Sequence, residues 1–355
     1  MGNLERRDSS SCAARGEPEI TSRMERDVQL YPLRFAPIFQ YRLWGGRELA
    51  RWSRTPLPDT DPVGEAWVLS DRPDHPSVVT EGTFKGHTIS QLIALAPELM
   101  LGKFARHFGR FPLLLKFLDV EEMLSVQVHP SDNQPDLIPA GETGKTEAWV
   151  VLEARTGSRV YAGLKPGVTR ADLQTLSKQT VNDCLASFSP SSGQAIVIEA
   201  GTVHSVGNGV VLFEIQENSD VTFRLYDWDH IDPKSGKRRP LQIDQALACV
   251  DFAQGEIRPI QPAIEPDPST LRERLFDGSH FRLWRVQSAE PFAVGAADEP
   301  RVLVCLEGPG SVEHIGEKFA MEKGAVILLP ASVGACRFLP SGAVTMLEIA
   351  LPDLP

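Results

Sequence analysis

The stretch FPLLLKFLDVEEMLSVQVHP (111–130) indicates the fold class most directly. It holds two short apolar runs, 111–120 and 124–130, which are typical of buried β-strands. Similar runs, with Gly and Pro between them, recur at 146–154, 195–200, 209–217, 221–229, 280–287, 301–308, 318–322, 325–331 and 343–351. Helical periodicity is clearest at 88–101 and 169–179. Many short strands separated by turns predict a mainly β protein of sandwich or barrel architecture.

The composition is that of an ordinary globular protein. The 355 residues are 42% hydrophobic and 23% charged, which excludes a disordered chain, a collagen and a coiled coil. No apolar run is long enough for a transmembrane helix. The formal net charge of −11 makes general binding to nucleic acid or to an anionic membrane unfavourable. The five cysteines are widely spaced and form no C-x-x-C, which favours a reducing cytoplasm.

The chain is predicted to have a tail, two folded units and a linker. Residues 1–29 are polar and lack the apolar segment of a signal peptide, so we expect a disordered tail. The proline-rich stretch IRPIQPAIEPDP lies within 257–270, which we interpret as a linker. It separates a large unit, 30–256, from a smaller one, 271–355.

A short internal repeat suggests that the two units are related. GQAIVIEAGTVH (193–204) resembles GAVILLPASVGA (324–335), with matching Gly and Ala positions. The first copy ends in His204, whereas the second has Ala335 there. If both copies belong to related barrels, only the first carries chemistry at this position.

Three polar clusters of the first unit could form a metal site. Gln127 and His129 share one strand face, because residues i and i+2 of a strand point the same way. Lys145 and Glu147 have the same spacing, and His204 lies in a glycine-flanked turn. Each residue alone is more often a hydrogen-bonded or ion-paired structural group. Two imidazoles and a carboxylate together suit Zn²⁺, Fe²⁺ or Mn²⁺.

The segment GVVLFEIQENSDVTFRLYDWD (209–229) contains two more charged residues of interest. It is predicted to form a β-hairpin, and a hairpin accounts for the polar residues near its turn. Arg224, however, lies inside a strand between Phe223 and Leu225. An inward arginine needs an anionic partner, either a carboxylate such as Glu214 or a substrate phosphate.

These motifs resemble a known family. The pattern G-x5-E-x-G-x2-H-x3-N (193–208) is similar to the second cupin motif, with Glu199 where proline is usual. The sequence Q-V-H with the later Glu147 resembles the first motif of type I phosphomannose isomerases in their short bacterial form. The segments 35–49, 64–71, 144–152 and 201–229 follow in that family's order.

The resemblance implies a fold, an activity and a set of site residues. It implies a mainly β chain with two cupin-like β-barrels (jelly-roll) and a few helices, the second barrel lacking metal ligands. It implies a zinc-dependent aldose–ketose isomerase that interconverts mannose 6-phosphate and fructose 6-phosphate through a cis-enediol, with one Zn²⁺ per chain. The implied metal ligands are Gln127, His129, Glu147 and His204. The implied catalytic residues are Arg224, Glu214 as proton carrier and Lys145, and the implied substrate-pocket residues are Ser125 and Lys145. Lys116 is a further candidate contact for the substrate phosphate.

Two other functional classes stay open. A cupin iron dioxygenase could use the same ligands, although a fourth protein ligand, Gln127, argues against it. A non-enzymatic sugar-phosphate-binding module could keep the ligands without needing a base. The expected partner is a phosphorylated sugar, and the sequence does not indicate an oligomeric state.

Four further residues lie near these motifs. Trp44, Trp67 and Trp149 are expected to pack in the core or at its rim rather than stack on a substrate. Glu65, in GEAW (64–67), either supports the metal site or only ends a strand.

Overall fold

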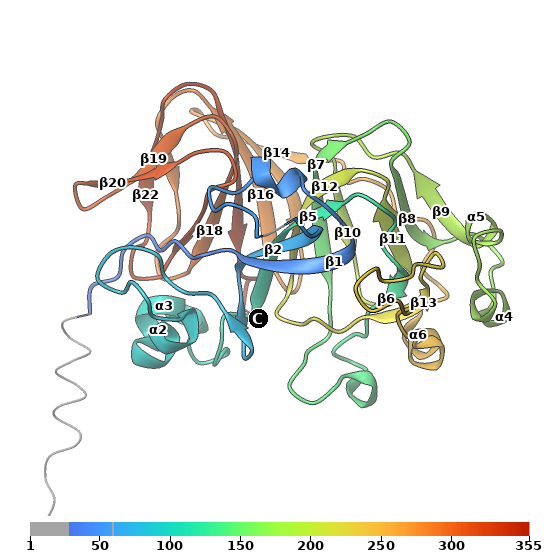
Figure 1. Cartoon of the computed structure of the whole chain (residues 1–355). Helices are drawn as coiled ribbons and strands as arrows, with labels where there is room; N and C mark the ends of the chain where they lie inside the picture. Colours follow the sequence, from blue (N-terminus) through green and yellow to red (C-terminus); the bar gives the residue numbers. More distant parts are fainter. Residues whose placement is uncertain (1–27, 59, 355) are drawn as a thin grey trace, which may run out of the picture.

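The computed structural model describes residues 28–58 and 60–354. The predicted tail, residues 1–29, therefore lies outside the described residues except for Val28 and Gln29. The described chain forms four larger antiparallel sheets and one two-stranded ribbon (Figure 1). The prediction of a mainly β protein with a few helices is confirmed.

The N-terminal part of the chain forms the first and second sheets. In the order of pairing, the first sheet comprises β1 (Ile38–Gly46), β2 (Val63–Leu69), β5 (Leu113–Val120), β12 (Val210–Glu217), β7 (Glu147–Ala154) and β10 (Ala195–Ile198). The second comprises β13 (Phe223–Tyr226), β6 (Val126–Val128), β11 (His204–Gly207), β8 (Arg159–Leu164) and β9 (Leu185–Phe188). A short ribbon pairs β3 (Asp71–Arg72) with β4 (His75–Pro76).

The C-terminal part forms the third and fourth sheets. The third comprises β14 (Ala263–Glu265), β15 (Leu271–Asp277), β16 (Arg282–Ser288), β23 (Val344–Ala350), β18 (Arg301–Glu307) and β21 (Val326–Leu329). The fourth comprises β17 (Phe292–Val294), β22 (Cys336–Pro340), β19 (Gly310–His314) and β20 (Glu317–Met321). Strand β14 lies inside the predicted linker 257–270, so part of that segment is an edge strand.

The strand order supports the internal repeat. The order β5-β12-β7-β10 of the first sheet corresponds to β16-β23-β18-β21 of the third. Likewise β6-β11-β8-β9 corresponds to β17-β22-β19-β20. Gly193 and Gly324, which begin the two copies of the repeat, have φ angles of 84° and 81°, a left-handed conformation that favours glycine. Neither pair of sheets closes into a ring of paired strands within the described residues; the sheets of each pair face each other across a shared apolar core.

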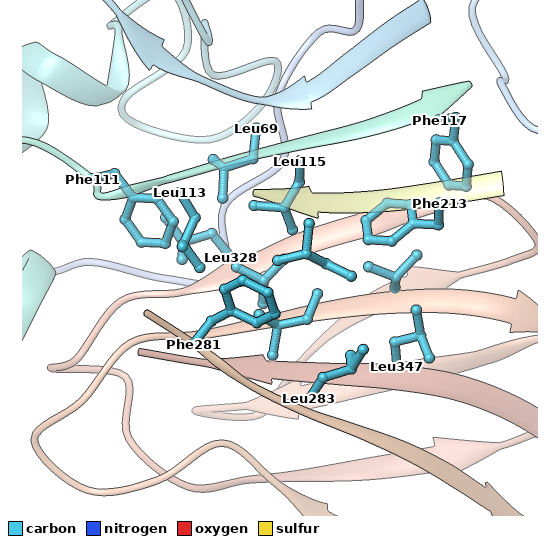
Figure 2. Packing of buried hydrophobic residues seen from close by; sticks show 14 of the residues in the cluster. Leu69, Phe111, Leu113, Leu115, Phe117, Phe213, Phe281, Leu283, Leu328 and Leu347 are labelled. Atoms are coloured by element: carbon cyan, nitrogen blue, oxygen red, sulfur yellow. The ribbon is translucent and has the colours of Figure 1, made fainter. Parts of the chain in front are cut away.

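The first sheet is covered on both faces. Leu118 and Leu212 pack with residues of the second sheet. Leu115, three residues before Leu118, and Phe213, one residue after Leu212, pack with residues of the third sheet such as Leu347 (Figure 2). Successive side chains of a strand point to opposite faces, so β5 and β12 are buried along their whole length. This explains the nearly continuous apolar run at 111–120.

The helices are short and lie outside the sheets. The predicted helical segment 88–101 forms α2 (Ile89–Leu95) and α3 (Pro97–Leu101), separated where Pro97 starts a new first turn. The segment 169–179 forms only α4 (Arg170–Gln174). The other helices are α5 (Val181–Cys184), α6 (Ile243–Cys249) and 3₁₀ turns at Glu48–Arg51, Gly102–Phe104 and Pro135–Leu137. Within the described ranges, no helix has the length and apolarity needed to cross a membrane.

Candidate active site

The residues of the candidate site face one another between the first and second sheets. Glu147 on β7 and Glu214 on β12 come from the first sheet, and His204 on β11 comes from the second. Gln127 on β6 lies opposite His204 in the neighbouring strand and opposite Arg224 on β13. A cavity of about 330 Å³ lies beside these residues. Its polar lining includes Arg42, Glu65, Lys116, Gln127, Lys145, Glu214, Asp220, Thr222, Arg224 and Arg239.

Three predicted metal ligands converge. His129, Glu147 and His204 are fully buried, and each offers a ligand atom within 4.8 Å of the others. Nε2 of His129 lies 3.5 Å from one carboxylate oxygen of Glu147, and Nε2 of His204 lies 3.4 Å from the other. Gln127 and Lys145 touch this cluster and also line the cavity, so the cluster borders the cavity.

Hydrogen bonds fix both imidazoles in the tautomer that a metal ligand needs. Nδ1 of His129 lies 2.8 Å from the carbonyl oxygen of Val221, and Nδ1 of His204 lies 2.9 Å from that of Thr202. In each ring Nδ1–H therefore donates, and the Nε2 lone pair faces the cluster. Burial, together with the charge of Lys145, lowers the pKa of His129 to about 3, and burial also lowers that of His204. Both rings are therefore neutral, as metal ligation requires.

Glu147 is a buried carboxylate whose oxygens are free to bind a further ligand. Burial alone would raise its pKa, but the charge of Lys145 holds the pKa of Glu147 well below its usual range. Nζ of Lys145 lies 3.0 Å from Oε2 of Glu147, an ion pair that lacks the directionality of a hydrogen bond. Among the described residues, neither oxygen of Glu147 nor Nε2 of His129 has a hydrogen-bond partner. Buried polar atoms without partners are rare, so this donor set fits a divalent metal ion.

Gln127 contacts the cluster through its amide. Its Nε2 lies 3.2 Å from Nε2 of His204, and its Oε1 accepts a hydrogen bond from the hydroxyl of Ser125 at 3.0 Å. Rotation of the amide by a half-turn exchanges the two atoms and directs Oε1 toward the cluster. Ser125 therefore lies where it orients Gln127.

Glu214 lies near the cluster but is held by different partners. Its Oε1 accepts a hydrogen bond from Nε1 of Trp149 at 2.9 Å, and its Oε2 lies 3.2 Å from Nζ of Lys116. Burial raises the pKa of Glu214 above its ordinary value, although Lys116 and Lys145 oppose the shift. A buried carboxylate with a raised pKa is suited to accept and return a proton near neutral pH.

A second charged network surrounds Lys116. Glu65 accepts hydrogen bonds from Arg42 at 2.9 and 3.1 Å and from Nε1 of Trp67 at 2.6 Å. Although burial opposes it, the charges of Arg42 and Lys116 lower the pKa of Glu65 to about 2. Glu65 thus stays ionised, and it lies 3.9 Å from Nζ of Lys116. Glu65 therefore lies inside β2 rather than at its end, and it lines the cavity beside Lys116.

Among the described residues, Arg224 is the one cation lining the cavity that forms no ion pair with a carboxylate. Its Nε is buried without a hydrogen-bond partner in the described part of the chain, and no described carboxylate, including Glu214, forms an ion pair with it. Burial lowers the pKa of Arg224, and the nearby guanidinium groups of Arg239 and Arg42 add to that effect. Arg239 is neutralised by Asp227, at 2.9 Å from Nε. Arg224 therefore remains available to an anionic ligand.

The sequence patterns did not reveal Arg42, Trp149 or Arg239 as site residues. Trp67 and Trp149 are buried, as predicted, yet each indole N–H donates to a carboxylate of the cavity. Trp149 could have been found from the sequence, because it lies two residues after Glu147 and therefore on the same strand face as this predicted ligand. No comparable local signal marks Arg42 or Arg239.

Comparisons with known proteins point to one family. The family model described as phosphomannose isomerase type I, catalytic domain, matches residues 33–145. Mannose-6-phosphate isomerase ManA of Bacillus subtilis is 31% identical over 308 residues, which cover 85% of this chain and 94% of the relative. A mannose-6-phosphate isomerase of Streptococcus mutans is 29% identical, covering 84% and 92% of the two chains.

Solved structures agree. The mannose 6-phosphate isomerase from Bacillus subtilis aligns with a TM-score of 0.80 and 25% identity, covering 90% of this chain and 99% of that one. A putative mannosephosphate isomerase from Archaeoglobus fulgidus aligns with a TM-score of 0.73 at 19% identity, which supports the fold alone.

Proposed function

The chain belongs to the type I phosphomannose isomerase family, and we propose from this membership that it is an enzyme that interconverts mannose 6-phosphate and fructose 6-phosphate with one zinc ion per chain. The observation that carries the proposal is the convergence of Nε2 of His129, Nε2 of His204 and the carboxylate of Glu147 in one buried cluster. Gln127 is the proposed fourth ligand, after its amide rotates. A cytoplasmic location, also proposed, fits a substrate of central carbohydrate metabolism.

The proposed reaction opens the sugar ring and moves one proton between C1 and C2 through a cis-enediol. A bound zinc ion would supply Lewis-acid polarisation of the substrate's carbonyl or enediolate oxygen. The protein's own part at this centre is to hold both imidazoles neutral and Glu147 ionised before the substrate arrives. Burial keeps both imidazoles neutral, and the hydrogen bonds to Val221 and Thr202 fix their tautomer. Lys145 keeps Glu147 ionised.

Glu214 is the proposed carrier of the proton. As a carboxylate it removes the proton from one carbon, and as a carboxylic acid it returns that proton to the other. Trp149 and Lys116 hold its two oxygens, so the carboxylate is oriented in the cavity wall. The raised pKa makes the protonated form accessible in the intermediate, which a strongly acidic carboxyl group would not allow.

Arg224 is the proposed anchor for negative charge on the substrate. A phosphate or a developing enediolate oxygen would give its guanidinium the partner that the protein does not provide. Lys116 and Lys145 also line the cavity, but each already forms an ion pair, Lys116 with Glu214 and Lys145 with Glu147. We therefore propose that the two lysines contact substrate oxygens near C1 and C2, with Lys145 acting in catalysis by keeping Glu147 charged. Ser125 is proposed to act through Gln127.

The first experiment is a coupled assay for fructose 6-phosphate formed from mannose 6-phosphate. It is run on protein as purified, after chelation, and after adding Zn²⁺ back. We expect turnover to disappear with the chelator and to return with zinc. Absence of turnover from folded protein with one metal per chain would contradict the isomerase and favour an iron oxygenase or a binding module.

The same assay tests the proton carrier. Glu214→Gln removes the titrating group but keeps an oxygen for Trp149, so metal content should be unchanged and kcat should fall by about 10²–10⁴-fold. Glu98→Gln, a change of an exposed helical residue, is the matched control. Normal turnover of the Glu214 variant would remove it from this role without touching the ligand assignment.

A further inference from the structure

The predicted metal cluster and Arg224 lie in one row across the second sheet. His204 on β11 is directly opposite Gln127 on β6, and Gln127 is directly opposite Arg224 on β13. Residues paired in this way point to the same face of a sheet, and neighbouring strands lie about 4.8 Å apart. The backbone of Arg224 is therefore about 10 Å from that of His204. A ligand that is held by the cluster at one end reaches Arg224 only if it is several atoms long.

The segment 227–242, between β13 and α6, brings a second arginine to this end of the cavity. The N–H of Gln242 donates to the carbonyl oxygen of Arg224 at 3.0 Å, and the N–H of Arg224 donates to Oε1 of Gln242 at 3.2 Å. The segment thus returns beside β13, the edge strand of the second sheet, and α6 follows it there (Figure 1). Arg239, three residues before Gln242, lines the cavity together with Arg224.

Arg239 has N–H groups left for a ligand. Its Nε donates to Oδ2 of Asp227 at 2.9 Å, and its Nη2 donates to Oδ1. These two bonds fix the plane of the guanidinium, whose rigid fork is then set in advance for a second partner. In the described part of the chain, Nη1 of Arg239 has no acceptor. With 21% of the side chain exposed beside the cavity, a ligand can reach these remaining donors.

Arg224 supplies the positive charge that Asp227 cancels at Arg239. Its Nε is buried and, among the described residues, has no hydrogen-bond partner. Burial lowers the pKa of Arg224, and the guanidinium of Arg239 is the next cause, so the two charges are close enough to repel each other. An anion between the two groups would remove that repulsion and complete the hydrogen bonds of both.

We propose that Arg239 is a specificity-determining residue, which together with Arg224 binds the phosphate group of the substrate and so selects phosphorylated over free sugars. The proposal rests on the proposed isomerase function. In mannose 6-phosphate the carbons C3, C4 and C5 separate the reacting carbons from the phosphate on C6, in keeping with the distance between the cluster and Arg224. The terminal oxygens of a phosphate suit one unpaired guanidinium and one free edge of another. Lys116 and Lys145 then stay at the reacting end of the sugar.

Two measurements on Arg239→Gln and the wild type test this assignment. In the coupled assay, the KM for mannose 6-phosphate should rise by about 10- to 100-fold, the effect of losing charge-assisted hydrogen bonds, and kcat should change less. In calorimetry on the zinc-loaded protein, the probe is mannitol 1-phosphate, the reduced open-chain form of the substrate, which cannot isomerise. Its affinity should fall by a similar factor, whereas that of mannitol should not change.

Two further variants serve as controls. Arg239→Lys keeps a charge for Asp227, so it should fold and still bind mannitol 1-phosphate more weakly than the wild type, because the planar fork is lost. Arg238→Gln changes an exposed neighbour whose partner is Asp229, and it should behave like the wild type. One metal per chain and an unaltered circular dichroism spectrum show that each variant is folded.

Three results would overturn the proposal. The first is a folded Arg239→Gln that binds mannitol 1-phosphate as tightly as the wild type, whatever happens to kcat. The second is an equal loss of affinity for mannitol, because the arginine would then act on the sugar or on the fold. The third is a wild type that does not bind mannitol 1-phosphate. The titration needs no turnover, so it decides the subsite even if the wild type fails to isomerise mannose 6-phosphate, which would contradict the proposed function alone.

Discussion

Replacing Lys116 by methionine should destabilise the protein in a manner that depends on pH. Nζ of Lys116 lies 3.2 Å from Glu214, and both side chains are almost fully buried. At an effective dielectric constant of about 20, a charge pair at this distance is worth about 5 kcal/mol. The loss of this interaction is partly offset, because the variant no longer pays the desolvation cost of a buried ammonium group. A net loss of about 3 kcal/mol is therefore expected where Glu214 is ionised.

The proton balance gives the sign of the pH dependence. Glu65 keeps its two hydrogen bonds from Arg42 at 2.9 and 3.1 Å in the variant, so its negative charge stays compensated when Lys116 is lost. Glu214 can take up a proton, because burial already raises its pKa and Lys116 no longer opposes the shift. A carboxyl group whose pKa is raised on folding favours the folded state at low pH and disfavours it as pH rises. The stability loss should therefore be large at pH 8 and small at pH 5.

Urea unfolding of Lys116→Met and the wild type at both pH values, with the same total zinc, measures this difference. Lys103→Gln, which breaks a surface ion pair at 3.5 Å, is the control and should change little at either pH. The acid limb of kcat/KM should also move to higher pH in Lys116→Met. An equal stability loss at pH 5 and pH 8, with an unmoved acid limb, would refute the coupling between Lys116 and Glu214.

Three further changes have separate readouts. His204→Ala should abolish both tight metal binding, measured by metal analysis after dialysis, and turnover, because it removes one of three convergent ligand atoms. Arg224→Ala should keep one metal per chain and the circular dichroism spectrum but lose most of kcat; a fully active variant would show that this guanidinium does not meet the substrate. Asp119→Asn should raise the free energy of unfolding by about 2 kcal/mol at pH 8 and leave it unchanged at pH 4. Burial raises the pKa of Asp119 to about 6, so the wild type loses stability as pH rises through that value, and urea curves at the two pH values measure the difference.

The fold was predictable where a strand carries one dominant pattern. The run 111–120 is apolar on both faces because β5 is covered by two sheets, and that pattern is easily recognised. Strand β1 was missed because its residues are only partly buried and mix aromatic, polar and basic side chains. The helix expected at 169–179 ends early because Thr180 accepts a hydrogen bond from the N–H of Ser177, which starts a separate turn.

The site was predictable where chemistry follows local spacing. His129, Glu147 and His204 could be recognised by their spacing and by their resemblance to known motifs, and the structure brings them together. The network around Lys116 depends instead on register, since β1, β2 and β5 bring Arg42 and Glu65 beside it from distant parts of the chain. The sequence of each strand by itself does not determine how β1, β2 and β5 are aligned with one another.

The structure of the proline-rich segment 257–270 was also only partly predictable from its sequence. Its composition predicts a linker, yet Ala263–Glu265 pairs with β15. Proline is compatible with an edge strand, because such a strand needs hydrogen bonds on only one side. The remaining residues of 257–270 stay predicted as the connection between the units.

The first sheet lies between two others, and this arrangement constrains the order in which the protein can fold during its synthesis. Leu115 and Phe213 are synthesised long before Leu347, which covers them from β23, the last strand of the chain. Strand β23 is also the partner of both β16 and β18, so the covering sheet cannot be completed until translation is nearly finished. Until then a ribosome-bound chain presents an apolar surface, which makes the nascent protein a substrate for chaperones. For the same reason, deletion of the C-terminal strand would produce an insoluble product rather than a smaller enzyme.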